Sequence, residues 1–222
     1  MKHRLDIKGR ISPNDDRDVL EYFDIEFTTP GDVHKITDQT AEGDDIDVYI
    51  NSGGGEIFAG SEIYTTLREL SETRNVNIYI TGLAASAASV IAMAAHSAIS
   101  PTAQMMVHCV SMITAGNHAE LTRVAEELRE ADRAMCRAYM DKSGMSEEEA
   151  LALMDAETWL SATKAVELGL VDEIMFDEQA EPAQMVADMK PLDIAELRKQ
   201  MNAQLSKKAR SREMDMLRLT QR

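Results

Sequence analysis

The sequence predicts an α/β fold in which a mainly parallel sheet is covered by helices. Two successive units of strand, glycine-containing loop and helix, at 46–70 and 76–95, carry this prediction. Parallel strands need such a crossover, because a tight hairpin joins only antiparallel neighbours. A third strand at 105–108, a long helix at 117–142 and a helical C-terminal tail complete the predicted fold.

The first unit follows a weaker strand and a helix. Alternation at 5–11 predicts a short strand, and Pro30 in a first turn predicts a helix at 30–40. The run 46–50 is β-branched and aromatic, which is typical of a strand, and the glycine-rich stretch 51–55 predicts a flexible loop. Apolar residues at helical spacing then predict a helix. They are Ile57, Ile63, Leu67 and Leu70.

The second unit repeats this order. Alternation at 76–80 predicts a strand, Gly82 turns the chain, and the small residues of 84–95 are typical of a tightly packed helix. A strand at 105–108 follows Pro101.

The helix at 117–142 would be about 39 Å long, which is more than a small domain needs. It either protrudes and drives assembly or is an ordinary surface helix with one buried stripe. The stripe consists of Leu121, Val124, Leu128, Ala131, Met135 and Ala138. Beyond it, the pair Ser146 and Glu149 predicts a capped short helix, and a helix from Ser161 precedes a strand at 170–175.

Charge divides the chain unevenly. The 222 residues carry a net charge of −16, yet 198–222 hold eight Lys or Arg against two acids, so 1–197 stand at 15 − 37 = −22. Such an acidic body argues against general nucleic-acid binding. We expect one domain at 1–176 and a charged extension at 177–222 that is helical or partly disordered.

Composition excludes several classes of protein. No run of 18 apolar residues occurs, and the residues after Met1 lead into no signal-peptide core, so a cytoplasmic protein without membrane contact is expected. Cys109 and Cys136 lie 27 positions apart without further ligand pairs, which supports neither zinc nor a disulfide framework. The loop 51–55 lacks the Lys-Ser/Thr of a nucleotide loop. We therefore expect no cofactor and no metal.

Ser86 stands at the second strand-to-helix turn, among alanines too small to obstruct it. A helix start presents unsatisfied amides, so the N–H of Ala87 could hold an oxyanion while Ser86 acts as a nucleophile. The alternative is that Ser86 only caps the helix, which is common for serine. Ser89, one turn further on, shares this ambiguity.

His108 is the one histidine at the end of an apolar strand, where a parallel sheet presents residues to a crevice. A lone histidine at such a place is more often structural than catalytic, so the case depends on its combination with the other motifs. The remaining histidines are His3, His34, His96 and His118.

The combination resembles the Clp protease proteolytic subunits over about residues 46–174. The matching motifs fall in the order and approximate spacing of that family. They are Ile50-Asn51-Ser52-Gly53-Gly54-Gly55, Ala59-Gly60, Ile63-Tyr64, Gly82-Leu83-Ala84-Ala85-Ser86, Met106-Val107-His108, Trp159-Leu160-Ser161-Ala162, Ala165-Val166-Glu167 and Gly169-Leu170-Val171-Asp172.

The resemblance implies a crotonase-like fold of repeated ββα units and a serine peptidase domain at 1–176. Ser86 would attack the scissile carbonyl, His108 would take its proton, and the amides of Gly55 and Ala87 would hold the oxyanion. The family's acid position, three residues before Leu160, is occupied by Glu157. The implied substrate-binding residues, which pair with an extended peptide, are Gly54, Glu56, Ile57, Val110, Ser111 and Met112.

Three departures separate the chain from the family. Gly53 replaces the usual proline, Glu157 replaces the usual aspartate with Asp155 as a nearby competitor, and the first strand begins within a few residues of Met1. Little is then left for axial loops, so an ATPase partner is doubtful. The chain is most similar to the Clp-related head-maturation proteases of tailed phages, whose partners are capsid and scaffold polypeptides in the host cytoplasm or a precursor capsid.

The resulting hypothesis is a serine endopeptidase that assembles through its long helix into rings. Two alternatives remain open. One is an acyl-CoA enzyme of the same fold, whose paired amides hold a thioester enolate and which needs no serine at position 86. The other is a ring-forming protein that has lost its chemistry through the change at Glu157.

Overall fold

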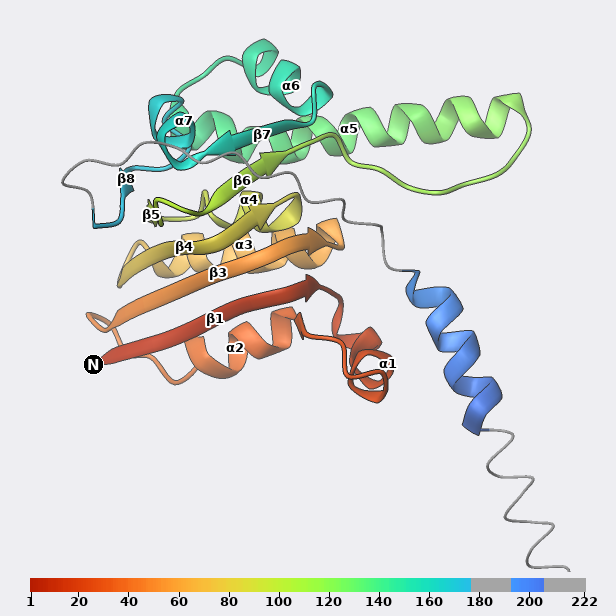
Figure 1. The fold of residues 1–222 in the computed structure, drawn as a ribbon, viewed down its shortest axis with the longest axis horizontal. Helices are drawn as coiled ribbons and strands as arrows, with labels where there is room; N and C mark the ends of the chain where they lie inside the picture. Colours follow the sequence, from red (N-terminus) through yellow and green to blue (C-terminus); the bar gives the residue numbers. More distant parts are fainter. Residues whose placement is uncertain (177–192, 206–222) are drawn as a thin grey trace, which may run out of the picture.

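The computed structural model describes residues 1–176 and 193–205, which form an eight-stranded sheet with helices packed on it (Figure 1). The strand order is β2-β1-β3-β4-β5-β8, and β6 pairs with both β4 and β7. All pairs are parallel except β6 with β7, which confirms the predicted fold class. The strands are β1 (Lys2–Ile11), β2 (Phe27–Thr28), β3 (Asp45–Gly55), β4 (Asn75–Ala85), β5 (His96–Ile99), β6 (Gln104–Val107), β7 (Thr158–Ser161) and β8 (Glu173–Ile174). The helices are η1 (Asn14–Asp16), α1 (Arg17–Tyr22), α2 (Pro30–Thr37), α3 (Ile57–Leu70), α4 (Ala87–Ile91), α5 (His118–Ser143), α6 (Glu147–Asp155) and α7 (Ala162–Glu167).

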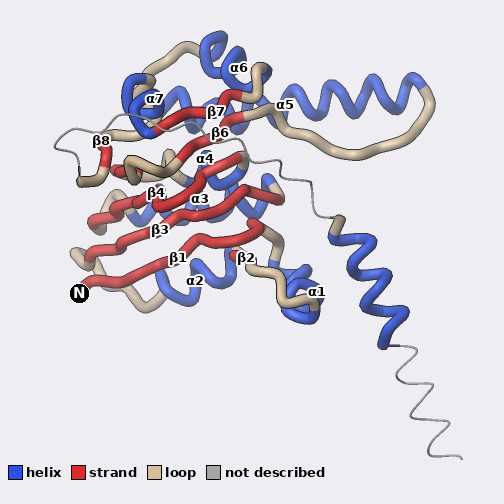
Figure 2. Tube along the Cα trace, viewed as in Figure 1, coloured by secondary structure: helices blue, strands red, loops and turns tan. Residues whose placement is uncertain are grey.

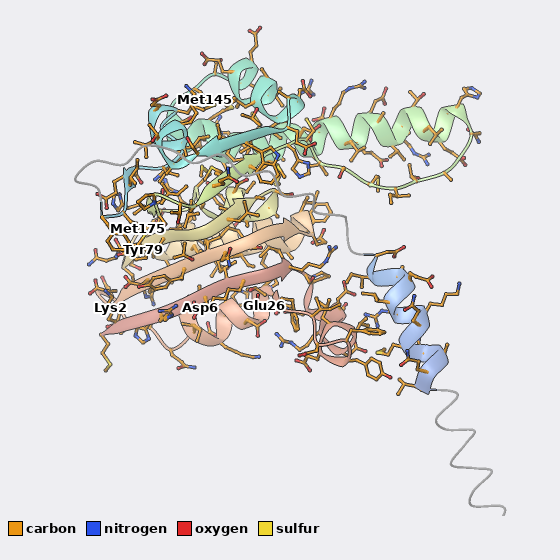
Figure 3. All side chains as sticks on the ribbon, in the orientation of Figure 1. Lys2, Asp6, Glu26, Tyr79, Met145 and Met175 are labelled. Carbon is orange, nitrogen blue, oxygen red and sulfur yellow. The ribbon has the colours of Figure 1, made fainter. Side chains whose placement is uncertain are left out.

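The two faces of the sheet differ in chemistry. Helices α2, α3 and α4 lie on one face (Figure 2), and the alternate residues that point toward them, such as Ile50 and Ile78, are fully buried. The other face carries polar and aromatic side chains, among them Lys2, Asp6 and Tyr79 (Figure 3). There the Tyr79 ring stacks on that of Tyr49 with centroids 5.1 Å apart. The core therefore lies between the sheet and the helices.

Two segments expected as loop and helix belong to strands instead. The stretch 51–55, predicted as a flexible loop, continues β3, because Gly54 and Gly55 pair with Arg10 and Ile11 of β1. The predicted helix at 84–95 was wrong at both ends. Ala84 and Ala85 pair with Met105 and Met106 of β6, so cross-strand pairing overrides the helical preference of alanine.

Short elements were the hardest to anticipate. Helix α4 spans only Ala87–Ile91, and β5 occupies His96–Ile99, where no strand was expected. Helix α1 and strands β2 and β7 were likewise not predicted. The capping box of Ser146 and Glu149 is present at the start of α6, as the sequence indicated.

Helix α5 extends well past the sheet, with the segment 109–117 running beside it (Figure 1). Its N-cap Asn117 accepts hydrogen bonds from the amides of Ala119 and Glu120, and Gly144 ends it in the left-handed conformation. The helix contains buried residues only near its C-terminal end. They are Cys136, Ala138 and Tyr139.

The described part of the C-terminal extension is a helix at 194–205 that contacts the domain. Arg198 donates to the Asp16 carboxylate at 3.0 Å, and the Tyr22 hydroxyl donates to Gln204 at 2.9 Å. Residues 177–192 and 206–222, which hold the rest of the expected extension, lie outside the described residues. Among the helices that are described, none has the length and apolar character to cross a membrane.

Candidate active site

Ser86 occupies the turn between β4 and α4 in a conformation that few non-glycine residues adopt. Its φ is 54° and its ψ is −128°, and such backbone costs about 1–3 kcal/mol and persists only where the surrounding structure imposes it. The Ser86 amide donates to the carbonyl of Met106 in β6 at 2.9 Å, which fixes the turn against the sheet. The side chain makes no capping hydrogen bond to α4. The simple N-cap interpretation of Ser86 is therefore wrong.

The Ser86 hydroxyl instead meets His108, whose Nε2 lies 2.7 Å from the serine Oγ. His108 follows the last residue of β6, and β6 runs parallel to β4, so both residues emerge at the same edge of the sheet. The other histidines of the body lie elsewhere, since His3 pairs with Asp44 and His96 with Asp172. The structure thus brings together the two side chains that the sequence singled out from separate motifs.

The glycine-rich end of β3 approaches this pair so closely that a side chain could not fit. A Cβ at Gly54 would lie 2.6 Å from the Ser86 Cβ and 2.5 Å from the Ala85 carbonyl oxygen, and φ at Gly54 is +86°. A Cβ at Gly55 would lie 2.0 Å from the carbonyl oxygen of Ile11. Both positions require glycine, and the strand can then present its backbone beside the serine.

A small cavity of about 60 Å³ opens in front of the pair. Its lining consists of Gly55, Ile57, Ser86, Ala87, Val90, His108, Val110, Ser111, Met135 and Tyr139. Three other residues expected to bind substrate do not line it. Gly54 packs against the backbone of Ala85 and the Cβ of Ser86. The Glu56 carboxylate accepts a hydrogen bond from the Ala59 amide at 2.6 Å and so caps α3. Met112 is 58% exposed.

A larger cavity of about 710 Å³ lies at the opposite ends of the strands, where β3 and β4 begin. Its lining is polar and charged, and includes Ser71 and His96. The Ser71 hydroxyl donates to the carbonyl of Arg68 at 2.6 Å rather than to a histidine. We therefore place the candidate chemistry in the smaller cavity, where a serine contacts a histidine.

Glu157 lies where the backbone can bring it to His108, but its side chain is exposed. The antiparallel register of β6 and β7 ends at Val107 with Thr158, and one further step places His108 opposite Glu157. Its φ is 47°, again unusual for a residue with a side chain. Within residues 1–176 and 193–205, no hydrogen bond joins the Glu157 carboxylate to His108.

Asp155, the competing acid, is already engaged by the thiol of Cys109, which donates to it at 3.1 Å. Burial, together with the carboxylates of Asp155 and Asp132, raises the pKa of Cys109 to about 12. The thiol therefore stays protonated at neutral pH, and a thiolate nucleophile beside His108 is disfavoured.

Helix α5 supplies contacts to the site that the sequence did not reveal. The Val110 amide, expected to pair with a substrate peptide, donates to the Asp132 carboxylate at 2.6 Å, and no strand forms at 110–112. Met135 and Tyr139 line the cavity. The only sequence signal was the apolar stripe that contains Met135, and it also fitted a core helix.

Comparisons with known proteins agree with these features. The Clp protease family model matches residues 35–178. The ATP-dependent Clp protease proteolytic subunit of Bacteroides fragilis is 33% identical over 142 residues, or 62% of this chain and 67% of the relative. Subunit 1 from Chlamydia muridarum is 32% identical over 142 residues, covering 62% and 73%. For another B. fragilis strain the match spans 63% of the relative, slightly under two thirds of its length.

A solved structure has the same fold. A ClpP1 point mutant from Listeria monocytogenes superposes with a TM-score of 0.63 at 24% identity, over 79% of this chain and 92% of that one. At this identity the likeness establishes the fold alone.

Proposed function

The chain belongs to the Clp protease family, and from this premise we propose that it is a serine endopeptidase with Ser86 as nucleophile and His108 as general base. The 2.7 Å contact between His108 Nε2 and Ser86 Oγ carries the proposal. A serine hydroxyl is a weak nucleophile until an adjacent base accepts its proton, and this geometry allows that transfer.

The reaction follows from the groups around the serine. Ser86 Oγ attacks the carbonyl carbon of the scissile peptide bond while its proton passes to His108 Nε2. The oxyanion that forms lies beside the amides of Ala87 and Gly55. His108 then protonates the leaving amine, the bond to nitrogen breaks, and a water activated by the same imidazole hydrolyses the acyl-enzyme.

We assign the acid of the triad to Glu157. Two observations support this assignment: Glu157 and His108 lie one step beyond the last β6–β7 pair, Val107 with Thr158, and Asp155 accepts a hydrogen bond from the Cys109 thiol. A carboxylate on the second ring nitrogen would fix the tautomer of His108 and stabilise the imidazolium. Glu157 would reach that nitrogen by a side-chain rotation, which its exposed position permits.

Assembly is the second part of the proposal. The first half of α5 and the segment 109–117 leave apolar side chains in solvent, such as Ile113 at 96% and Leu121 at 43% exposure. Copies of the chain would cover these residues in a ring that encloses the active sites.

The natural substrates that we propose are capsid or scaffold polypeptides of a tailed phage, cut inside a precursor capsid or the host cytoplasm. Gly53 in place of the family's proline and a basic tail on an acidic body support this proposal. Coexpression with candidate precursor proteins, followed by mass spectrometry of the fragments, tests it.

A fluorophosphonate probe tests the reaction itself. We expect one adduct per chain on Ser86, no adduct in Ser86→Ala, and wild-type labelling in the control Ser97→Ala, which removes a buried hydroxyl far from His108. An acyl-CoA enzyme of this fold, or a ring protein without chemistry, would give no adduct at all. Labelling at another serine would refute the assignment of Ser86.

A further inference from the structure

Helix α5 meets the nucleophile turn through a pair of buried hydroxyl groups. Ser89 Oγ lies 2.8 Å from the hydroxyl of Tyr139, and the same Oγ donates to the carbonyl of Ser86 at 2.6 Å. Ser89 is fully buried and Tyr139 is 3% exposed. A buried hydroxyl needs a hydrogen-bond partner. Here the two hydroxyls bond to each other, and Ser89 also bonds to the backbone carbonyl of Ser86.

The proton positions in this series of hydrogen bonds follow from counting donors. Ser89 has one hydroxyl proton, and the bond to the Ser86 carbonyl uses it, so Tyr139 must donate to Ser89. Burial raises the pKa of Tyr139 above its usual value, which keeps its hydroxyl protonated and able to donate. The order is therefore Tyr139 to Ser89 to the carbonyl of Ser86.

The carbonyl of Ser86 also accepts from the amides of Ser89 at 2.9 Å and Val90 at 3.3 Å. A serine that bonds back to the carbonyl three residues earlier is common in helices and needs no functional reason. Two facts distinguish this one. Its acceptor belongs to the residue with the strained φ of 54°, and Tyr139, 50 residues further along the chain, orders its hydroxyl.

We propose that Ser89 and Tyr139 are positioning residues for the nucleophile. By holding the carbonyl of Ser86 they keep its strained backbone in place, and with it the Oγ on His108 Nε2. The proposal rests on the proposed function, because it assumes that Ser86 is acylated. It assigns to Ser89, which sequence analysis left as a second candidate nucleophile, a supporting role instead.

The same helix also holds the other side of the cavity. Asp132 lies seven residues before Tyr139, on the same face of α5 after two turns, and accepts from the Val110 amide just beyond His108. One rigid helix thus touches the segments that carry both the nucleophile and the base. A shift of α5 would move the two segments together, and the buried half of α5 serves as a template for the site.

The test compares Tyr139→Phe and Ser89→Ala with the wild-type protein. Tyr139→Phe keeps the buried ring and removes only the donor, so we expect the fold and assembly to persist. The rate of acylation by the fluorophosphonate should fall about tenfold, which corresponds to the loss of roughly one hydrogen bond. For a short peptide substrate, kcat should fall by the same factor while KM stays within about twofold.

Two matched controls separate positioning from general destabilisation. Tyr64→Phe removes a tyrosine hydroxyl from α3, and Ser97→Ala removes a fully buried serine hydroxyl, and both should acylate at the wild-type rate. The double variant Ser89→Ala/Tyr139→Phe should be acylated at the same rate as Ser89→Ala alone, because both changes interrupt the same series of hydrogen bonds.

Each outcome is decisive. If the wild type is acylated and Tyr139→Phe is acylated equally fast, the positioning role is wrong while Ser86 remains the nucleophile. If the effects of the two single variants add fully, the two hydroxyls act separately. The proposed hydrogen-bond series from Tyr139 through Ser89 to the Ser86 carbonyl is then wrong. If Ser86 is not acylated in the wild type, the proposed function fails first and this inference fails with it. Should a variant lose its thermal transition, the remaining single variant decides.

Discussion

The two halves of helix α5 differ clearly in how far they are buried. From His118 to Glu130 no residue of the helix is buried, and this half extends beyond the sheet. From Ala131 onward the helix packs on the domain, where Cys136 and Tyr139 are buried and Lys142 donates to the carbonyl of Ala95 at 2.8 Å. One continuous apolar stripe therefore has two surroundings, with solvent at one end and the wall of the candidate active site at the other.

This difference teaches that an unbroken sequence pattern need not mean one structural role. If the division holds, changes around the cavity should alter chemistry without altering assembly. Changes in the exposed half should do the reverse. Each of the following experiments can break that separation or sharpen it.

The largest effect is expected from Ser86→Ala. Removal of a triad serine lowers turnover by about 10⁶-fold, so peptide hydrolysis should vanish. The oligomeric state, measured by light scattering, and the thermal transition should both match those of the wild type, since the Ser86 side chain caps no helix. A variant that retained wild-type turnover would end the nucleophile assignment.

A somewhat smaller loss is expected from Glu157→Gln, at about 10⁴-fold in kcat, the scale known for the acid of a serine triad. Glu157→Asp should keep part of the activity, and Asp155→Asn should keep all of it. Steady-state kinetics on one short peptide measure all three. Full activity in Glu157→Gln with loss of activity in Asp155→Asn would show that Asp155 is the triad acid. Full activity in both variants would show that the enzyme works with Ser86 and His108 alone.

The exposed half is tested by the double change Leu121→Glu and Leu128→Glu. Charges on this stripe should prevent copies from packing, so light scattering should report the 24.6 kDa monomer. The control Arg123→Ala, a 70% exposed side chain on the same half, should leave the oligomer intact. An unchanged oligomer in the double variant would place the interface elsewhere.

The ion pair of Asp172 with Lys142, near the C-terminal end of α5, gives a prediction about how stability depends on pH. Burial would raise the pKa of Asp172, but Lys142, the Ser97 amide and His96 outweigh it and lower the pKa below its usual value. A depressed folded pKa stabilises the protein above the unfolded pKa, about 3.9, and that stability is lost as the pH falls through the folded value. The melting temperature of Asp172→Asn should lie below that of the wild type at pH 5–7. The difference between the two melting temperatures should disappear below about pH 4. A gap that widened in acid would contradict this sign.

The smallest effect is expected from a chain that ends at Ala195. It loses the hydrogen bonds of Arg198 and Gln204 to the domain and the buried side chain of Met201, none of which contacts Ser86 or His108. Activity on a short peptide should be unchanged. If that activity were lost, the basic tail would belong to the catalytic assembly.

The fold class could be predicted from local patterns of strand and helix. The sequence also singled out Ser86 and His108, which the structure brings into contact, while their catalytic roles stay a prediction. Strand periodicity located β3 and β4, and the turn after β4 and the end of β6 identified Ser86 and His108. The alanines at 84 and 85 were misread because their local preference is helical, whereas their structure is set by pairing with β6, about 20 residues away.

Contacts between distant side chains could not be predicted in the same way. Nothing beside Ser89 in the sequence indicates Tyr139, and nothing beside Val110 indicates Asp132. The orientation of Glu157 was also out of reach, since its backbone register follows from β7 while its side chain stays exposed. The domain boundary near residue 176 stays a prediction, because the residues that follow it are not described.

The hydrogen bond between Ser89 and Tyr139 also has a consequence for biosynthesis. A nascent chain emerges from the ribosome with its N-terminus first, so the segment of Ser86 and Ser89 appears long before the end of α5. With the positioning role inferred for Tyr139, the serine gains its full reactive geometry only after about fifty more residues have been made and have docked. Synthesis of the nucleophile is then separated in time from its full activation, so we expect an unfinished chain without Tyr139 to react more slowly than the complete one.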